Sequence, residues 1–351
     1  MADLDGAEWL FCTRILPEVS RTFGLGIRLL PRRLSESVTI AYLLCRIADT
    51  VEDDRSLAPG RRTPLLHRLA EAVRGGGGEE EIEAAFEHPT SADQLLAHRC
   101  GWIIRSFRRL SVPEQAAIAG PVCEMCLGMA AFIDRRATGG SELPEPLETL
   151  AELKEYCGYV AGTVGRLLTG LFCLHTRQVS NDLERRLSQH AEGFANGLQL
   201  TNVIKDIHAD AARGISFIPR DVCARYGIEP KDLLDPRFER ESNAVLGVLG
   251  HEAQSGLDQA VEYLTEIPQR QYRIRLFCQL PILLGCLSLS RMRLGIPGGR
   301  IRFGKVSRTT VYLVLALSLA TAWSNRLARA SYRLLASAPL RDAGAQDPLR
   351  S

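Results

Sequence analysis

The chain has 351 residues, of which 46% are hydrophobic and 6% aromatic, and its 43 basic and 41 acidic side chains leave a net charge of +2. So small a net charge excludes the broad positive field that recruits nucleic acid, and few aromatics with abundant Leu, Ala and Arg favour helix over sheet. The ten cysteines include one CxxC, at Cys123 and Cys126. No second CxxC or paired histidines follow it, so we expect buried free thiols rather than a zinc site.

Helical periodicity runs almost throughout the chain, and its interruptions are short loops rich in Pro and Gly. The fold class that we expect is therefore all-α, with a single large helical bundle over residues 1–338 that encloses a central cavity, followed by a frayed tail over 339–351. The predicted helices are 7–29, 35–54, 62–74, 92–109, 113–137, 149–175, 181–209, 219–226, 242–266, 270–293 and 307–336.

The N-terminus and the apolar segments of the chain bear on its localisation. The N-terminus, MADLDGAEWL, is acidic and does not resemble a signal peptide, so we expect a cytoplasmic chain. No uninterrupted run reaches the ~18–20 apolar residues that cross a bilayer. The longest candidate, 311–323, is predicted to be a buried helix, with a peripheral contact at a membrane surface as the alternative.

Two of the predicted helices carry a narrow polar stripe on an otherwise apolar cylinder. In the segment 37–54 the stripe covers about 60° of the helix and consists of Tyr42, Arg46, Asp49 and Asp53. In the segment 194–210 it covers about 80° and consists of Gln199, Asn202, Asp206 and Asp210. A solvated face is the usual explanation of a charged stripe. Here the broad apolar flanks indicate buried helices whose stripes face a polar space inside the protein.

Four aspartates that face one cavity repel one another, and a bound cation relieves the repulsion. The candidate ligands are oxygen donors, which favours Mg²⁺, with Mn²⁺ as an alternative, over zinc. Because Mg²⁺ bridges carboxylates to substrate phosphates, we expect a diphosphate or another polyphosphate as ligand. A di-iron bundle would need Glu-x-x-His on two helices, and this motif does not occur in the sequence.

These residues lie in motifs that resemble those of the squalene and phytoene synthase family of head-to-head prenyltransferases. The resemblance extends over roughly residues 15–310 and has the following motifs in chain order: Ser20-Arg21-Thr22-Phe23, Asp49-Thr50-Val51-Glu52-Asp53, the segment YCGYVAGTVG from Tyr156 to Gly165, and QLTNVIKDIHAD from Gln199 to Asp210. It implies an isoprenoid synthase type of helical bundle with Mg²⁺ and farnesyl diphosphate as cofactor and substrate.

The resemblance also implies roles for individual residues. The implied metal ligands are Asp49, Glu52, Asp53, Asn202, Asp206 and Asp210. The implied substrate contacts are Ser20, Arg21, Phe23, Arg46, Ala161, Gly165, Gln199, Lys205 and Arg213. Aromatic rings that could stabilise a carbocation are Tyr42, Tyr156 and Phe277. For Ala161 and Gly165, close packing between helices is an equally good explanation of their small size.

In this family one farnesyl diphosphate ionises, and the double bond of a second captures the allylic cation to give a cyclopropyl diphosphate. Squalene synthases then reduce the rearranged cation with NADPH, whereas phytoene and dehydrosqualene synthases lose a proton. Two similarities favour the squalene type: Phe277-Cys278-Gln279-Leu280-Pro281, and a basic segment with Lys305 and Arg308 that could bind NADPH.

Other functions within the family stay open. At Ile282 the chain departs from the eukaryotic enzymes, which carry Gln there, and this departure bears on the second half-reaction. Lys305 and Arg308 could equally begin a surface helix. The alternatives are a phytoene or dehydrosqualene synthase and an enzyme that stops at presqualene diphosphate. The sequence leaves the oligomeric state open as well.

Overall fold

The structure is a computed structural model that describes residues 6–20, 22–57, 60–136, 146–176, 181–293 and 307–336, and every regular element in these ranges is a helix. The all-α prediction is therefore confirmed. The helices are α1 (Ala7–Val19), α2 (Thr22–Leu29), α3 (Arg32–Asp53), α4 (Arg62–Arg74), α5 (Glu79–Ala85), α6 (Ala92–His98), α7 (Cys100–Arg108), α8 (Val112–Arg136), α9 (Leu150–Cys157), the π-helix η1 (Gly158–Gly162), α10 (Thr163–His175), α11 (Asn181–Ala212), α12 (Arg220–Ala224), the 3-10 turns η2 (Pro230–Asp232) and η3 (Pro236–Phe238), α13 (Glu239–Glu266), α14 (Tyr272–Arg293), α15 (Arg308–Thr321) and α16 (Asn325–Ala336).

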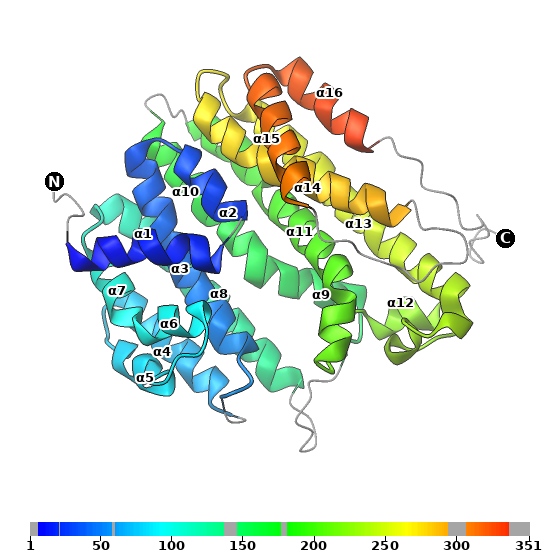
Figure 1. Ribbon diagram of the computed structural model, residues 1–351, viewed down its shortest axis with the longest axis horizontal. Helices are drawn as coiled ribbons and strands as arrows, with labels where there is room; N and C mark the ends of the chain where they lie inside the picture. The colour runs from blue at the N-terminus through cyan, green and yellow to red at the C-terminus, as the bar shows by residue number, and fades with distance from the viewer. Residues whose placement is uncertain are drawn as a thin grey trace.

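The two helices with polar stripes, α3 and α11, both lie inside the bundle. In Figure 1 the N-terminal helices α1 to α7 gather on one side, α13 to α16 on the other, and α10 and α11 run between them. Helix α3 packs against α1, α2, α4, α6, α7, α8 and α10, and α11 packs against α9, α10, α13 and α14. Neighbours on most sides explain why apolar residues surround each stripe.

Glycines let α11 approach its neighbours closely. A Cβ atom on Gly197 of α11 would lie 2.6 Å from the carbonyl carbon of Gly256 in α13. A Cβ atom on Gly165 of α10 would lie 2.5 Å from the carbonyl oxygen of Ala191 in α11. No side chain fits at such distances, so these glycines set how close the helices come.

The predicted elements need correction in four places. The predicted helix 7–29 is two helices, because Ser20 is extended (φ −149°, ψ 107°) and its hydroxyl accepts a hydrogen bond from the Gly24 amide at 3.0 Å. The predicted helix 92–109 is also two, α6 and α7, which are separated at Arg99. The predicted helix 307–336 is likewise two, α15 and α16. Helix α5 has no counterpart in the prediction, because a run of glycines precedes it and Ile82 is its one buried residue.

By length and composition alone, three helices in the described part of the chain could cross a membrane: Val112–Arg136, Leu150–His175 and Tyr272–Ser290. The sequence predicted no segment of sufficient length because only its uninterrupted runs of apolar residues were considered. Mean hydropathy over a helix also accepts segments that contain small polar residues. In the structure these helices contribute to the bundle, where α8 packs against α4 and α10, and α14 packs against α2 and α13.

Candidate active site

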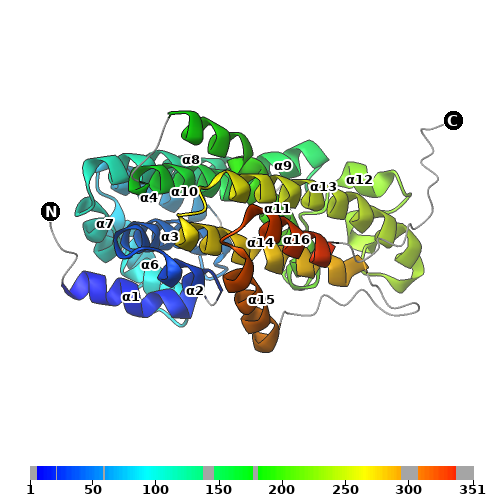
Figure 2. The ribbon, with the colours of Figure 1, turned by 90° about the horizontal axis from the view of Figure 1, so that it is seen from above.

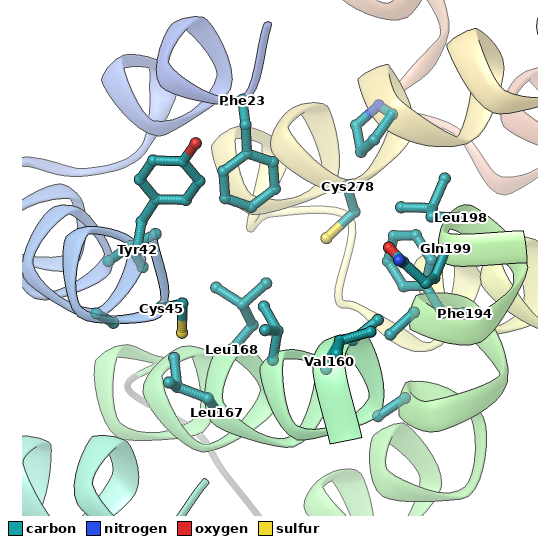
Figure 3. A pocket seen from close by; sticks show the side chains of 18 of the residues that line it. Phe23, Tyr42, Cys45, Val160, Leu167, Leu168, Phe194, Leu198, Gln199 and Cys278 are labelled. Atoms are coloured by element: carbon teal, nitrogen blue, oxygen red, sulfur yellow. The ribbon is translucent and has the colours of Figure 1, made fainter. Parts of the chain in front are cut away.

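A cavity of about 240 Å³ lies between α2, α3, α10, α11 and α14, as the family resemblance implied. Figure 3 shows Tyr42 and Phe23 at one end of this cavity, Leu167, Leu168 and Val160 along one wall, and Phe194, Leu198 and Gln199 at the other end. Of the predicted site residues, those that line the cavity are Phe23, Tyr42, Arg46, Asp49, Ala161, Gly165, Gln199, Asn202 and Phe277. The walls are mostly apolar, and the charged groups Arg46 and Asp49 lie together on α3.

Aromatic rings from four helices, α2, α3, α10 and α14, meet at the end of the cavity that holds Tyr42. The ring of Phe23 stacks on Tyr42 with centroids 5.4 Å apart, and it meets the ring of Phe277 edge to face at 5.1 Å. Phe172 packs edge to face against the other side of Phe277 at 5.8 Å. The π-electron faces of such a cluster can stabilise a cation inside an apolar cavity.

Burial favours the neutral, weakly reactive forms of three potential nucleophiles on the cavity wall, Tyr42, Cys45 and Cys278. The Tyr42 hydroxyl donates to the Val19 carbonyl at 3.2 Å, and burial raises the pKa of this phenol. Burial also raises the pKa of the thiols of Cys45 and Cys278, both of which point toward the cavity in Figure 3. A protonated thiol and a neutral phenol are poor nucleophiles, so these walls would not trap a carbocation readily.

Carboxylates crowd the polar side of α3. Burial raises the pKa of Asp49 to about 7 against the opposing charge of Arg46, and the carboxylate of Asp53 raises it further. Burial, then the carboxylates of Asp53 and Asp49, raise the pKa of Glu52 to about 8. The side chain of Asp49 is 34% exposed, so water at the cavity mouth moderates these shifts. Burial is the main cause of both shifts, and the repulsion among Asp49, Glu52 and Asp53 adds to it, so a cation bound here would favour the ionised carboxylates.

Arg46 is the cation nearest to Asp49. Its Nη1 lies 3.7 Å from Asp49 Oδ2, and its Nε donates to Asp93 Oδ1 at 2.9 Å. Asp93 lies in α6, and the sequence interpretation missed it because nothing near it in the chain links it to α3. Its carboxylate holds the Arg46 guanidinium at the cavity lining.

The polar stripe of α11 faces the same region from the opposite helix. Lys205 Nζ donates to Asn202 Oδ1 at 2.7 Å and lies 3.5 Å from Asp206 Oδ2. Arg213, just after α11, pairs with Asp210 and also lies 3.6 Å from Asp53 Oδ1 on α3. A cation of the chain itself therefore bridges the two aspartate motifs.

The oxygen atoms of the two aspartate motifs are suitable ligands for a hard divalent cation, whose coordination the substrate would complete. The candidate ligands are carboxylate and amide oxygens, and Arg213 already marks the space between the motifs as one that favours positive charge. Among the described residues, no three His, Cys, Asp or Glu side chains come close enough to hold a metal ion by themselves. An ion such as Mg²⁺, which takes one or two carboxylates and completes its shell with water and phosphate oxygens, suits this arrangement.

Tyr156 lies beside the carboxylate group rather than on the cavity wall. Its hydroxyl donates to both oxygens of Glu52 at 3.3 Å, and its ring stacks on Phe217 with centroids 5.0 Å apart. The guanidinium of Arg136 covers the same Phe217 ring at 5.2 Å, and its charge opposes the rise that burial causes in the pKa of Glu52. The sequence did not reveal this interaction. Tyr156 is thus placed to orient Glu52.

The segment that follows Tyr156 forms the π-helix η1, which lies between α9 and α10 and brings Val160 and Ala161 to the cavity. Such π-turns often occur at functional sites because they shift the side chains that follow. Gly165 could serve both as a substrate contact and in close helix packing, because it lines the cavity and also packs against the backbone of α11.

Some of the predicted site residues do not join this arrangement. Ser20 caps α2 through its hydroxyl, as described above. Arg21 and Lys305 lie outside the described residues, as does the side chain of Arg308, whose backbone begins α15. Their predicted contacts with diphosphate and NADPH stay predictions.

Known proteins share both the sequence pattern and the fold. The chain is 27% identical to the squalene synthase of Homo sapiens over 279 residues, which are 80% of this chain and 62% of that protein. It is 30% identical to the squalene synthase of Eremothecium gossypii over 316 residues, 88% of this chain and 68% of that one. The chain therefore spans less than two thirds of the length of the human protein.

Solved structures show the same fold. A ligand complex of TcSQS superposes with a TM-score of 0.79 at 24% identity, covering 97% of this chain and 94% of that one. A dehydrosqualene synthase in complex with a ligand superposes with a TM-score of 0.63 at 20% identity, covering 89% and 95%. The family model for squalene/phytoene synthase matches residues 16–294. Because it extends over most of the chain, this match shows that the chain belongs to the squalene/phytoene synthase family.

Proposed function

We propose that this protein is a squalene synthase, a farnesyl-diphosphate farnesyltransferase that joins two molecules of farnesyl diphosphate through presqualene diphosphate and reduces the product to squalene with NADPH. The observation that carries the proposal is one cavity that is lined both by the charged groups of Asp49 and Arg46 and by an aromatic cluster. Relatives named squalene synthase support the choice of reaction.

The charged groups would bind the leaving diphosphate. Arg46 and Lys205 stand on opposite helices at this polar region, and Arg213 lies between the aspartate motifs, so a diphosphate could receive hydrogen bonds from both sides. The residues that would hold the metal are Asp49, Asp53, Asp206 and Asp210, with Glu52 and Asn202 beside them. When bound, Mg²⁺ would neutralise the diphosphate as it leaves, and NADPH would supply the hydride for the final reduction.

The apolar part of the cavity would protect the carbocations. The first ionisation leaves an allylic cation, and attack by the double bond of the second molecule, with loss of a proton, closes the cyclopropane ring. The rings of Phe23, Tyr42 and Phe277 offer π-electron faces, while the protonated thiols of Cys45 and Cys278 line the wall without a strong nucleophile.

A second candidate function shares the first half-reaction. Phytoene and dehydrosqualene synthases end with loss of a proton, and a presqualene diphosphate synthase stops before the second ionisation. The likeness to a dehydrosqualene synthase is one of fold. The residues proposed for NADPH, Lys305 and Arg308, have no described side chains, so the choice rests on product analysis.

The test uses purified full-length protein with farnesyl diphosphate and Mg²⁺, with and without NADPH, followed by identification of products by mass spectrometry. We expect squalene only with NADPH, and dehydrosqualene, hydroxylated products or presqualene diphosphate without it. A product profile that is indifferent to NADPH would assign the chain to the phytoene or dehydrosqualene type. Absence of any condensation product would overturn the proposal.

Variants of the aspartate motifs test the metal ligands. Asp49→Asn and Asp206→Asn should each abolish release of diphosphate and leave the fold intact, because each substitution relieves repulsion in the metal-free protein. The control is Asp235→Asn, since Asp235 pairs with Arg237 in a remote turn. Activity of Asp49→Asn within tenfold of wild type, or turnover that persists after chelation, would refute the assignment.

A further inference from the structure

Helix α15 carries its large apolar side chains on the outside of the protein. Tyr312 and Leu313 are each 65% exposed, Leu319 is 46% exposed, and Trp323, just beyond the helix, is 55% exposed. The described exposed positions of α15 are 309, 312, 313, 316, 319 and 320, and none of them carries a charge. Figure 2 shows that α15 projects from the body of the bundle.

The inner face of the same helix is mixed: Val314 is buried, Leu315 and Leu317 pack against the core, and two polar side chains lie beside them. Ser318 is fully buried and Thr321 is 9% exposed, and the Thr321 hydroxyl accepts a hydrogen bond from Gln279 of α14 at 2.7 Å. The buried guanidinium of Arg275 donates to the Ala322 carbonyl at 2.5 Å. These bonds fix which face of the helix is turned outward. A helix at a water surface normally carries charged or polar side chains on its outer face, so an outer face without charge and with Tyr312, Leu313 and Leu319 exposed is suited to an apolar environment.

Arginines surround the end of this face. The Tyr272 hydroxyl donates to the Leu319 carbonyl at 2.8 Å, so α15 lies against the start of α14, where Arg270 and Arg273 are exposed. The Nε of Arg273 donates to the Leu29 carbonyl of α2 at 2.5 Å. Arg326 is three residues beyond Trp323. Arg28 shares a surface depression with Arg273. The rim of the apolar face is therefore positively charged.

The positive charge of this rim is not cancelled locally. In the described ranges no side chain pairs with Arg28, Arg270 or Arg326. Nearby carboxylates have other partners: Glu36 pairs with Arg32 at 3.1 Å, Glu266 pairs with Arg186 at 2.7 Å, and Glu262 pairs with Arg329. The surface thus combines an exposed apolar stripe with a cationic rim.

We propose that the outer face of α15 docks onto the surface of an anionic lipid membrane. Leu313 and Leu319 would enter the boundary between headgroups and acyl chains, as the apolar side of an interfacial helix does. Tyr312 and Trp323, at the two ends of the stripe, are the aromatic types that concentrate at membrane–water interfaces. The arginines of the rim would meet lipid phosphates.

Charge argues against a second copy of this chain as the occupant. A symmetric dimer through this face would bring the arginine rims of two protomers together, with no unpaired carboxylate identified beside them. A negatively charged bilayer complements both the rim and the stripe. The inference does not depend on the proposed reaction, although α14 links the two, since it supports α15 and carries Phe277 of the cavity.

The test is sedimentation of the full-length protein with vesicles of phosphatidylcholine alone or mixed with phosphatidylglycerol. We expect binding to the anionic vesicles that weakens with salt. The double variant Leu313→Glu, Leu319→Glu should lower the partition coefficient about tenfold or more, because charged groups are costly at the acyl boundary. The matched control, Leu10→Glu with Leu174→Glu, adds the same charge on α1 and α10, at side chains that are 50% and 48% exposed. It should bind as well as wild type, apart from the repulsion between the added negative charge and the anionic lipid, which both double variants share.

A second variant tests the rim, and light scattering tests the dimer. Arg270→Glu with Arg326→Glu should remove the preference for anionic vesicles while the thermal unfolding temperature stays near that of wild type. The proposal is overturned if wild type does not bind the vesicles, or if the two double-leucine variants bind equally well. It is also overturned if wild type is a dimer that does not bind vesicles and the variant Leu313→Glu, Leu319→Glu is a monomer, because the outer face of α15 would then join two copies.

Discussion

Replacing Arg46 with glutamine would show whether the polar end of the cavity depends on a positive charge from α3. The guanidinium lies 2.9 Å from Asp93 and 3.7 Å from Asp49, and its side chain is 33% exposed. Glutamine keeps the polar character and part of the length but removes the charge. Asp49 would lose the nearest group that opposes the rise of its pKa, and Asp93 would lose its partner.

The two effects of this substitution differ in size. An ion pair of this exposure contributes about 1 kcal/mol to folding, and a short charge-assisted hydrogen bond raises that to about 2 kcal/mol, so we expect the free energy of unfolding to fall by about 1–2 kcal/mol. If the charge faces a bound diphosphate, its loss costs about 2–5 kcal/mol of transition-state stabilisation, which is about 30- to 5,000-fold in kcat/KM.

The assay combines release of diphosphate at saturating Mg²⁺ with unfolding in urea. Arg166→Gln is the matched control, because Arg166 is 34% exposed and pairs with two carboxylates, Glu124 and Glu192, away from the cavity lining. It should lose similar stability and keep its activity. If Arg46→Gln keeps kcat/KM within threefold of wild type, Arg46 does not act on the diphosphate and the role assigned to the stripe of α3 is wrong.

Three further predictions concern stability. Glu114→Gln should lower the thermal unfolding temperature at neutral pH, because two serines and a histidine hydrogen-bond to the Glu114 carboxylate. Burial raises the pKa of Glu114, but these hydrogen bonds outweigh it and hold the pKa below the usual value. The stabilisation is lost as the pH falls through the lowered pKa, so the difference from wild type should shrink below about pH 4. Gly165→Ala should cost about 1–3 kcal/mol in a urea titration, since its Cβ would meet the α11 backbone, whereas Gly120→Ala, which has open space, should be neutral or stabilising. Arg275→Met should cost about 3–5 kcal/mol in the same titration, because the buried guanidinium bonds three backbone carbonyls at the ends of α13 and α15.

Helical periodicity was sufficient to find the core of the candidate site. A face of a helix follows from residue spacing alone, so Tyr42 and Asp49 on one helix and Gln199 and Asn202 on another could be grouped before their neighbours were known. The structure places all four on the lining of one cavity. The break after α1 was missed for a local reason, since the Ser20 hydroxyl can either continue a helix or cap the next one.

Partners that come from remote parts of the chain could not be predicted in this way. Asp93 holds Arg46 from α6, and Arg136 approaches Glu52 from the end of α8, but no spacing rule connects these pairs. The same holds for the outer face of α15, which was predicted to be buried. Its apolar residues suggested burial, but the packing against α14 turns Ser318 and Thr321 inward with Val314 and leaves Tyr312 and Leu313 exposed.

The separation of charge from aromatic rings along α3 constrains how the proposed reaction could proceed. Asp49 and Tyr42 are seven positions apart on α3, which corresponds to about 10 Å along a helix axis at about 1.5 Å per residue. Arg46 and the carboxylates can therefore act on the diphosphate while the rings of Tyr42 and Phe23 contact carbons deeper in the cavity. A carbocation formed where the diphosphate leaves would first lie near Cys45, whose protonated thiol is a weak nucleophile. The aromatic cluster would act on positive charge only after that charge, or the intermediate that carries it, has moved about two helical turns inward.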